Sequence, residues 1–332
     1  MKRKVVSDHF SATKLRVLAL SIVLLLAFSA SAGSQPARLN VSYSSESPGS
    51  LPVWIAKESG LYAKNGLDVE LLRVTGNVAV MALVSGEVNI GLMGGSAAIT
   101  SNLGGSDAVI VAAGQVSTDY SLVTHPKVKT AQQLKGGIVG VASIVGSSMT
   151  ATLYALQKVG LGTKDVNVLL AGGTPERLAA LRSGRIQATI LSPPTSFIAE
   201  QEGYNVLLDV IAMPLPYNSI VSTRRFVREN PDSARRFIKA HLEAVSLLKT
   251  DRDTGIKILA KYLRRTRERL LLEKSYDISV SDSIMPRKQY PTLAGIKSIS
   301  DSLVKTYPKA ATARPEDFTE IGLSSNSTTT DL

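Results

Sequence analysis

Residues 165–186, with the sequence DVNVLLAGGTPERLAALRSGRI, decide the fold expected for this 332-residue chain. The apolar segment 166–170 predicts a strand, and Gly172-Gly173 predicts the turn after it. Residues 175–182 predict a helix, which Ser183-Gly184 ends before another strand at 186–191. A strand, a helix and a strand in close succession are typical of an α/β fold with an open sheet.

The same pattern occurs earlier in the chain, at residues 68–88, with the sequence DVELLRVTGNVAVMALVSGEV. In both copies Asp-Val opens the first strand, and Ala-Leu-x-Ser-Gly ends the helix before the second strand. One copy lies in each half of the α/β region. Such a repeat favours two related lobes over coincidence.

The segments around these two copies continue the alternation of strands and helices. Further strands are predicted at 39–43, 88–93, 108–113 and 137–142, and further helices at 51–64, 97–103 and 147–158. Beyond residue 213 the pattern changes to helices, predicted to begin at Asn230-Pro231, to pass through 256–263 and to span 293–307. We expect the polar residues 321–332 to form a disordered tail.

Residues 1–32 have the pattern of a secretory signal peptide. Five basic residues accompany an apolar stretch at 17–28, and Ala30 and Ala32 predict cleavage after Ala32. The stretch is shorter than the ~20 residues that span a bilayer as a helix. The alternative is that the segment is retained as an N-terminal anchor. The sequence therefore predicts a periplasmic or otherwise extracytoplasmic protein.

Composition limits what the exported part can do. The chain has no cysteine, which excludes disulfides, thiolate metal sites and a lipid-modified cysteine. The formal charge of +11 falls to +7, from 33 basic and 26 acidic residues, without residues 1–32. The densest basic segment, KYLRRTRER at 261–269, is interpreted as a solvated helix face rather than a nucleic-acid site.

Ligands of open α/β sheets bind beyond the carboxyl ends of the strands. The segments that follow the predicted strands are 47–51, 94–96, Gln115, 145–150, 172–174 and 192–194. They share glycine and small hydroxyl residues, often just before a helix, so their backbone N–H groups suit an acidic or strongly polar ligand. Each loop alone is equally well explained as a turn, but six of one character on one edge favour a site.

Catalytic motifs are absent from the sequence. After residue 32 the histidines are His125, in a predicted loop, and His241, on the apolar face of a predicted helix. No H-x-x-x-H, G-x-S-x-G or phosphate-loop motif occurs, and Ser147-Ser148 has no base nearby in the sequence. We therefore expect a protein that is not an enzyme and that uses no cofactor or metal. The single tryptophan, Trp54, is expected either to stack on a ligand or to pack in the core.

The run LPVWIAKESGLY at 51–62, followed by GLDVE at 66–70, resembles substrate-binding proteins of the nitrate, sulfonate and taurine ABC importers. That family also includes thiamine-precursor binding proteins. Further matches are ALVSGEV at 82–88, QLKG at 133–136, and residues 180–186 followed by Pro193-Pro194. The resemblance covers about residues 39–250.

This resemblance implies a two-lobed type II periplasmic-binding-protein fold with open sheets, a hinge and a central ligand cleft. Crossovers are expected near 119–124 and 211–222, so lobe I is 37–122 plus 214–320 and lobe II is 123–213. The ligand-binding positions that it implies are Ser47, Ser50, Leu51, Gly95, Ser96, Gly146, Ser147, Ser148, Thr174, Pro193 and Asn218, to which the residue pattern adds Trp54 and Gln115. No arginine stands in these loops, which disfavours a strongly anionic ligand.

The function implied is a monomeric solute-binding protein that delivers a small molecule to the permease of an ABC importer. Expected ligands are a sulfonate, a nitrate-like anion, a pyrimidine or an aromatic acid, with no nucleic-acid partner and with membrane contact only through the permease. A ligand-sensing partner of a membrane receptor is one alternative. A small-molecule lyase or hydrolase on the same fold is a less favoured one, and the cysteine-rich motif of the pyrimidine-synthesising branch is absent.

Overall fold

A computed structural model describes residues 35–144 and 146–320. The predicted signal peptide and the predicted polar tail lie outside these residues, so both stay predictions. All elements described below belong to one unit of the chain. No helix within the described ranges is long and apolar enough to cross a bilayer.

The first half of the sheet contains three parallel strands in the order β2-β1-β3. These are β1 (Ala37–Tyr43), β2 (Leu67–Arg73) and β3 (Ile90–Met93). The connections are α2 (Leu51–Glu58) and α3 (Leu61–Lys64) after β1, and α4 (Gly76–Ser85) after β2. The predicted helix at 51–64 is interrupted at Gly60, whose φ of 69° is a left-handed conformation that glycine adopts readily.

The second half of the sheet repeats this arrangement with the order β6-β5-β7. Its strands are β5 (Ile138–Val141), β6 (Asn167–Leu170) and β7 (Ala188–Leu191), connected by α6 (Ser147–Lys158) and α7 (Thr174–Arg182) and followed by α8 (Thr195–Gln201). The two repeats seen in the sequence are thus β2-α4-β3 and β6-α7-β7. Both of their helices end at a left-handed glycine, Gly86 and Gly184.

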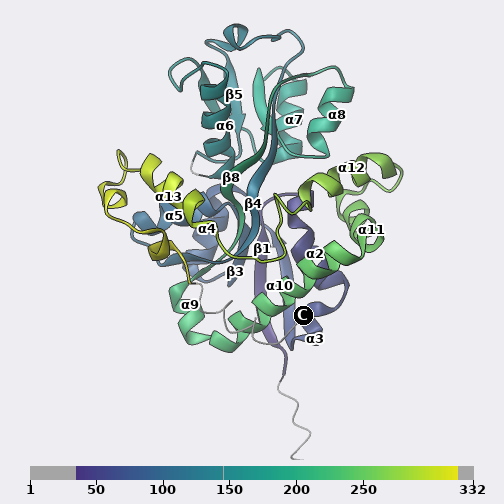
Figure 1. Ribbon diagram of the computed structural model, residues 1–332, viewed down its shortest axis with the longest axis vertical. Helices are drawn as coiled ribbons and strands as arrows, with labels where there is room; N and C mark the ends of the chain where they lie inside the picture. The colour runs from purple at the N-terminus through teal and green to yellow at the C-terminus, as the bar shows by residue number, and fades with distance from the viewer. Residues whose placement is uncertain (1–34, 145, 321–332) are drawn as a thin grey trace, which may run out of the picture. The chain divides into compact units, whose positions relative to one another are not determined.

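Two long antiparallel strands, β4 (Ala108–Thr124) and β8 (Asn205–Thr223), join the halves into one eight-stranded sheet (Figure 1). The first half pairs with β8 through β3, and the second half pairs with β4 through β7. The helix α5 (Gly95–Leu103) precedes β4. The expected crossovers at 119–124 and 211–222 are therefore parts of longer strands. The expected change to helices at residue 213 was wrong, because β8 continues to Thr223.

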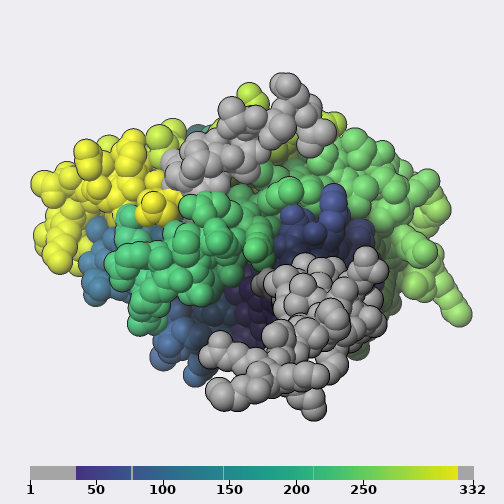
Figure 2. All heavy atoms as spheres, turned by 90° about the horizontal axis from the view of Figure 1, so that it is seen from below, coloured from purple at the N-terminus to yellow at the C-terminus, as the bar shows by residue number. Residues whose placement is uncertain are grey.

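The C-terminal third is mostly helical and covers much of the face seen in Figure 2. Its helices are α9 (Arg224–Glu229), α10 (Pro231–Thr250), α11 (Arg252–Leu263), α12 (Arg269–Ser279) and α13 (Leu293–Ser302). Short 3-10 helices occur at Pro48–Ser50, Ala131–Leu134, Pro308–Ala311 and Pro315–Phe318. The helix α10 packs against the first half, where the Phe237 ring stacks on Tyr62 at 5.5 Å between centroids.

The basic segment 261–269 is not one helix face, because a turn separates α11 from α12 within it. Several of its charges are paired with acidic side chains. Lys261 contacts Glu58, Arg265 contacts Glu268, and Arg269 contacts Glu273. Pairing of this kind leaves less of the segment free for a nucleic-acid backbone than the sequence alone shows.

The core of the first half surrounds Trp54, which is fully buried. Its ring stacks on Tyr262 at 4.5 Å and meets Tyr43 edge-on. His241 is also buried, as its helical position predicts, and its Nε2 atom lies 2.9 Å from the carbonyl oxygen of Ala113. A separate apolar cluster, which includes Leu181 and Leu191, forms part of the core of the second half.

Candidate functional site

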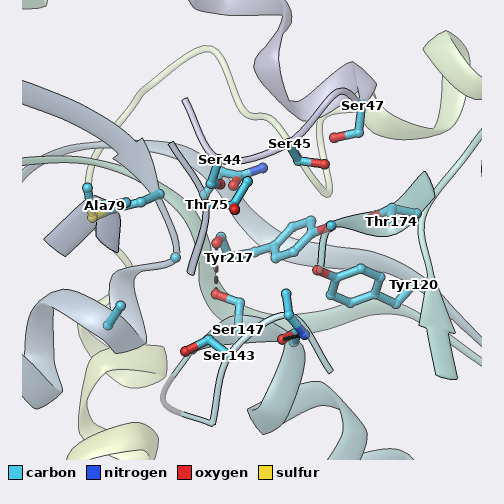
Figure 3. A pocket seen from close by; sticks show the side chains of 18 of the residues that line it. Ser44, Ser45, Ser47, Thr75, Ala79, Tyr120, Ser143, Ser147, Thr174 and Tyr217 are labelled. Atoms are coloured by element: carbon cyan, nitrogen blue, oxygen red, sulfur yellow. Dashed lines mark hydrogen bonds between the residues drawn. The ribbon is translucent and has the colours of Figure 1, made fainter. Parts of the chain in front are cut away.

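A cavity of about 90 Å³ is lined by residues from both halves of the sheet and from both crossover strands (Figure 3). The first half contributes the loop after β1 and the starts of α4 and α5. The second half contributes the starts of α6 and α7, and Tyr120 of β4 and Tyr217 of β8 stand between the halves. Hydroxyl side chains from Ser44, Ser45, Ser47, Thr75, Ser143, Ser147, Ser148 and Thr174 surround the space.

Four helices begin at this cavity. Their N-cap residues are Thr75 of α4, Gly94 of α5, Gly146 of α6 and Gly173 of α7, and all four line the cavity. In none of the four helices does a side chain of the N-cap residue accept a hydrogen bond from an N–H group of the first turn. The first turn of a helix has N–H groups without an intrahelical partner, and the helix dipole makes that end positive. The arrangement suits a ligand with strong hydrogen-bond acceptors.

The start of α5 in the first half and the start of α6 in the second half approach each other closely. A Cβ atom at Gly94 would lie 2.5 Å from Oγ of Ser147 and 3.2 Å from its backbone nitrogen. The Ser147 hydroxyl donates a hydrogen bond of 2.9 Å to the carbonyl oxygen of Tyr217, which is the dashed line in Figure 3. Glycine at position 94 therefore permits the contact between the two halves beside the cavity.

Arg177 supplies a buried positive charge at the cavity, with 1% of its surface exposed. The guanidinium donates from Nε and Nη2 to the carbonyl oxygen of Ile190, at 3.2 and 3.1 Å. It also donates from Nη1 to the carbonyl oxygen of Gly172 at 2.8 Å, and from Nη2 to Oγ1 of Thr174 at 3.3 Å. Burial lowers the pKa of Arg177, because the charged form is poorly solvated there.

This arginine corrects an expectation from the sequence. No arginine stands in the loops that follow the strands, so a cationic group at the site was not anticipated. Arg177 lies within α7, and its side chain returns toward the start of that helix, where Gly172 and Thr174 lie. Side chains on a helix point toward its N-terminus, so a residue within α7 can reach the loop that precedes the helix.

Tyr120 and Tyr217 form a pair at the crossover strands. Their rings are 4.8 Å apart between centroids and inclined by 66°, and Figure 3 shows their hydroxyl ends directed toward each other. Burial raises the pKa of Tyr120, although the charge of Arg177 beside it acts in the opposite direction. Burial and the charge of Asp119 raise the pKa of Tyr217 well above its usual value. Both phenols are therefore neutral near pH 7 and able to donate hydrogen bonds.

An ion pair joins the two halves near the cavity. Nη2 of Arg73, at the end of β2, lies 2.7 Å from Oε1 of Glu176 in α7, and Nε of Arg73 lies 3.7 Å from Oε1 of Glu46. Although burial acts in the opposite direction, the hydrogen bond from Arg73 lowers the pKa of Glu176. Glu176 neighbours Arg177 in the chain, so one turn of α7 takes part in both the ion pair and the cavity wall.

The structure brings together part of the predicted residue set. The members that line the cavity are Ser47, Gly146, Ser147, Ser148, Thr174 and Asn218. The members that do not line it are Ser50, Leu51, Trp54, Gly95, Ser96, Gln115 and Pro193.

Several of these latter residues have structural partners close to the cavity. Ser50 donates from Oγ to the carbonyl oxygen of Ser45 at 2.6 Å. Gln115 accepts a hydrogen bond of 2.6 Å from Nδ2 of Asn218 and thereby supports a residue that does line the cavity. Gly95 is packed against Pro216, whose Cβ would lie 2.7 Å from a Cβ added at position 95.

The cavity also contains residues that the sequence analysis did not select. Besides Arg177 and the two tyrosines, they include Ser44, Ser45, Thr75 and Ser143. Thr75 could have been found from the repeat, because it stands before α4 as Gly173 stands before α7. Within the described ranges, no three histidine or acidic side chains gather in a way that would hold a metal ion.

The chain is similar to known proteins over most of its length. A model of the NMT1-like family matches residues 33–264. A protein of Brucella abortus strain 2308, whose name describes it as a binding protein, is 29% identical over 254 residues, which cover 74% of this chain and 78% of that protein. A protein of Brachyspira hyodysenteriae, named as an ABC transporter periplasmic binding protein, is 27% identical over 144 residues, 43% of this chain and 41% of the other.

Solved structures show the same fold. The alkanesulfonate-binding protein SsuA of Xanthomonas axonopodis pv. citri superposes with a TM-score of 0.69 at 19% identity, covering 85% of this chain and 96% of SsuA. The periplasmic nitrate-binding protein NrtA of Synechocystis PCC 6803 superposes with a TM-score of 0.70 at 16% identity, covering 87% of each chain. The expected α/β periplasmic-binding-protein fold is thus confirmed, and the match over residues 33–264 shows that the chain belongs to the NMT1-like family.

Proposed function

We propose that this chain is a periplasmic solute-binding protein, which captures a small polar molecule in the cavity and delivers it to the permease of an ABC importer. The observation that carries the proposal is the convergence of four helix N-termini, two from each half of the sheet, on one cavity. The family match and the names of the relatives support the same function. The signal-peptide pattern at residues 1–32 supports export.

The proposed mechanism is closure of two lobes about β4 and β8. Lobe I comprises residues 37–122 and 214–320, and lobe II comprises residues 123–213. The register of β4 against β8 shifts several times between Ile110 and Asp119, which gives the strand pair local irregularities where it passes from one half to the other. Hinge motion there would open the cavity to solvent, and ligand would favour the closed form through contacts with both lobes.

Binding is favoured over catalysis by the residues around Ser147. The Ser147 hydroxyl donates to a backbone carbonyl, and the cavity lining within the described ranges holds no histidine, lysine or carboxylate that could act as a base. A hydrolase needs such a base within hydrogen-bond reach of its nucleophile. The proposal is therefore a binding protein with no catalytic residue.

Thermal-shift screening of the purified protein tests this function. Small sulfonates, carboxylates, nitrate and pyrimidines are offered, because a cavity of about 90 Å³ favours a small ligand in this conformation. A ligand of the folded state raises the melting temperature by mass action. We expect a hit whose affinity falls, without any product being formed, when Ser147 is changed to alanine. Turnover of the hit that Ser147→Ala abolishes would contradict the proposal.

A further inference from the structure

We propose that the ligand carries an oxyanion group, a carboxylate, sulfonate or phosphate, and that Arg177 determines this preference. The inference rests on the proposed function, because it concerns the same cavity. Arg177 is the one charged side chain among the described residues that line the cavity. The lining therefore has a formal charge of +1, and its other polar side chains are neutral hydroxyls and an amide.

Among the described residues, Arg177 forms no salt bridge with an acidic side chain, although the charge of the neighbouring Glu176 acts on it. In the part of the chain that the structure describes, Arg177 makes four hydrogen bonds to two backbone carbonyls and to the hydroxyl of Thr174, and its side chain also interacts with the neutral phenol of Tyr120. The adjacent acid, Glu176, is paired with Arg73 instead. A buried cation held only by neutral acceptors is costly, and an anion placed beside it recovers part of that cost. The uncompensated positive charge of Arg177 thus points to a negatively charged ligand.

The N–H groups at the helix N-termini also favour an oxyanion ligand. The starts of α4, α5, α6 and α7 surround the cavity, and three of their four N-caps are glycines that bring no side-chain oxygen to compete for the N–H groups. Helix N-termini and a guanidinium are the groups that bind oxyanions best in proteins. Each of these four helices has at least nine residues, so each carries a substantial dipole.

The tyrosine pair is compatible with an oxyanion. Tyr120 and Tyr217 are neutral near pH 7, because burial raises the pKa of each. They therefore add hydroxyl donors without adding negative charge. A cationic ligand would find neither a carboxylate nor a phenolate in the described lining, and it would face Arg177 across a poorly solvated space.

The test compares ligands that differ only in charge. Matched pairs are ethanesulfonate with ethanesulfonamide and propionate with propionamide, and inorganic phosphate and ethylamine extend the series. Affinities are measured by calorimetry at constant ionic strength on the wild-type protein, on Arg177→Gln and on Arg177→Lys. The control is Arg182→Gln, which removes the same charge from the same helix at an exposed position paired with Glu202.

We expect the wild type and Arg182→Gln to bind one class of anion at least about tenfold more tightly than its neutral partner. Arg177→Gln should lose about tenfold for the anion and change little for the neutral molecule, and Arg177→Lys should retain part of the preference. A difference between propionate and propionamide indicates a carboxylate, and a difference between ethanesulfonate and ethanesulfonamide indicates a sulfonate. Tight binding of inorganic phosphate indicates a phosphate.

Three outcomes would overturn the inference. Equal or tighter binding of the neutral or cationic molecules would do so while leaving the proposed function intact, and this comparison needs only the wild type. An equal loss for both members of a pair in Arg177→Gln would show that the residue has a structural role. Absence of binding by every molecule in this series and in the wider screen would contradict the proposed function as well.

Discussion

Nη2 of Arg73 lies 2.7 Å from Oε1 of Glu176, so a side chain at the end of β2 holds the first turn of α7 across the cavity region. The two residues belong to opposite halves of the sheet. The arginine side chain is 32% exposed and the glutamate 46% exposed, which places the pair partly in solvent. Such a pair is weak by itself, but it forms only when the two halves are close.

Glu176→Gln should therefore weaken ligand binding modestly, by about fivefold or less, mainly through faster dissociation. Arg73→Gln should have a similar effect, and the double variant should lose little more, because each change removes the same ion pair. Calorimetry gives the affinities and stopped-flow measurements give the rates. Losses that simply add in the double variant would show that the pair does not couple the halves.

The ion pair also predicts a pH dependence. Since the pKa of Glu176 is lowered in the folded protein, the coupling is fully present above the usual pKa of a glutamate, about 4.3, and is lost as the pH falls through the lower value. The coupling energy from the same double-variant cycle should thus be constant from pH 7 to pH 5 and should decrease only in more acidic solution. A coupling energy that falls between pH 7 and pH 6 would contradict this assignment.

Glycines at the starts of α5 and α6 should respond differently to alanine. In Gly95→Ala the new Cβ would lie 2.7 Å from Cβ and 2.9 Å from the carbonyl oxygen of Pro216, so the helix must move and stability should fall by about 1–3 kcal/mol. In Gly146→Ala the nearest atom, Cβ of Ser143, is 3.7 Å away, and the change should be below about 1 kcal/mol. Urea unfolding of the two variants is the measurement, and equal losses would contradict the packing described.

Gly94→Ala should affect binding more than stability. Its Cβ would press on Ser147 from the opposite half, which hinders the closed form but not the folding of either half. We expect affinity to fall about fivefold, with the urea midpoint nearly unchanged. Gly146→Ala also adds one methyl group at a cavity N-cap but meets no atom closer than 3.7 Å, so the comparison separates the contact with Ser147 from added bulk at the cavity. Unchanged affinity in Gly94→Ala would show that the two helix starts need not approach for binding.

His241 should make stability depend on pH. Burial lowers its pKa, while its hydrogen bonds to Gln289 and Ala113 act in the opposite direction. The unfolded state binds a proton near pH 6.5, whereas the folded state takes it up only at a lower pH, so stability should fall as the pH falls from 7 to 5. Urea unfolding of His241→Gln should show a smaller fall over this range. An identical pH slope in the variant would assign the effect to other groups.

The strand and helix pattern was predictable where it is local. The predictions for residues 165–191 place β6, α7 and β7 within two residues at each end, because apolar runs and Ser-Gly helix ends are short-range signals. The crossover strands were predicted too short, since Ser117, Thr118 and Asp119 look like loop residues. The structure buries all three inside β4, where Ser117 and Thr118 donate to the carbonyl oxygens of Ser283 and Val210, and Oδ2 of Asp119 accepts from Ser279.

The site was predictable only in its loops. Ser147 and Thr174 were selected because they open helices after strands, and both line the cavity. Tyr120 and Tyr217 lie within crossover strands, and their meeting depends on the register of β4 against β8, which a sequence does not determine. Trp54 was selected from the sequence but does not line the cavity, because its ring packs in the core between Tyr43 and Tyr262.

The crystal structure of the protein with a bound hit from the screen tests the central claim most directly. We predict that the molecule lies in the cavity and contacts residues of both halves, Thr75 or Gly94 on one side and Ser147 or Thr174 on the other. A molecule bound outside the cavity, or one that touches a single half and leaves the other in place, would contradict the account.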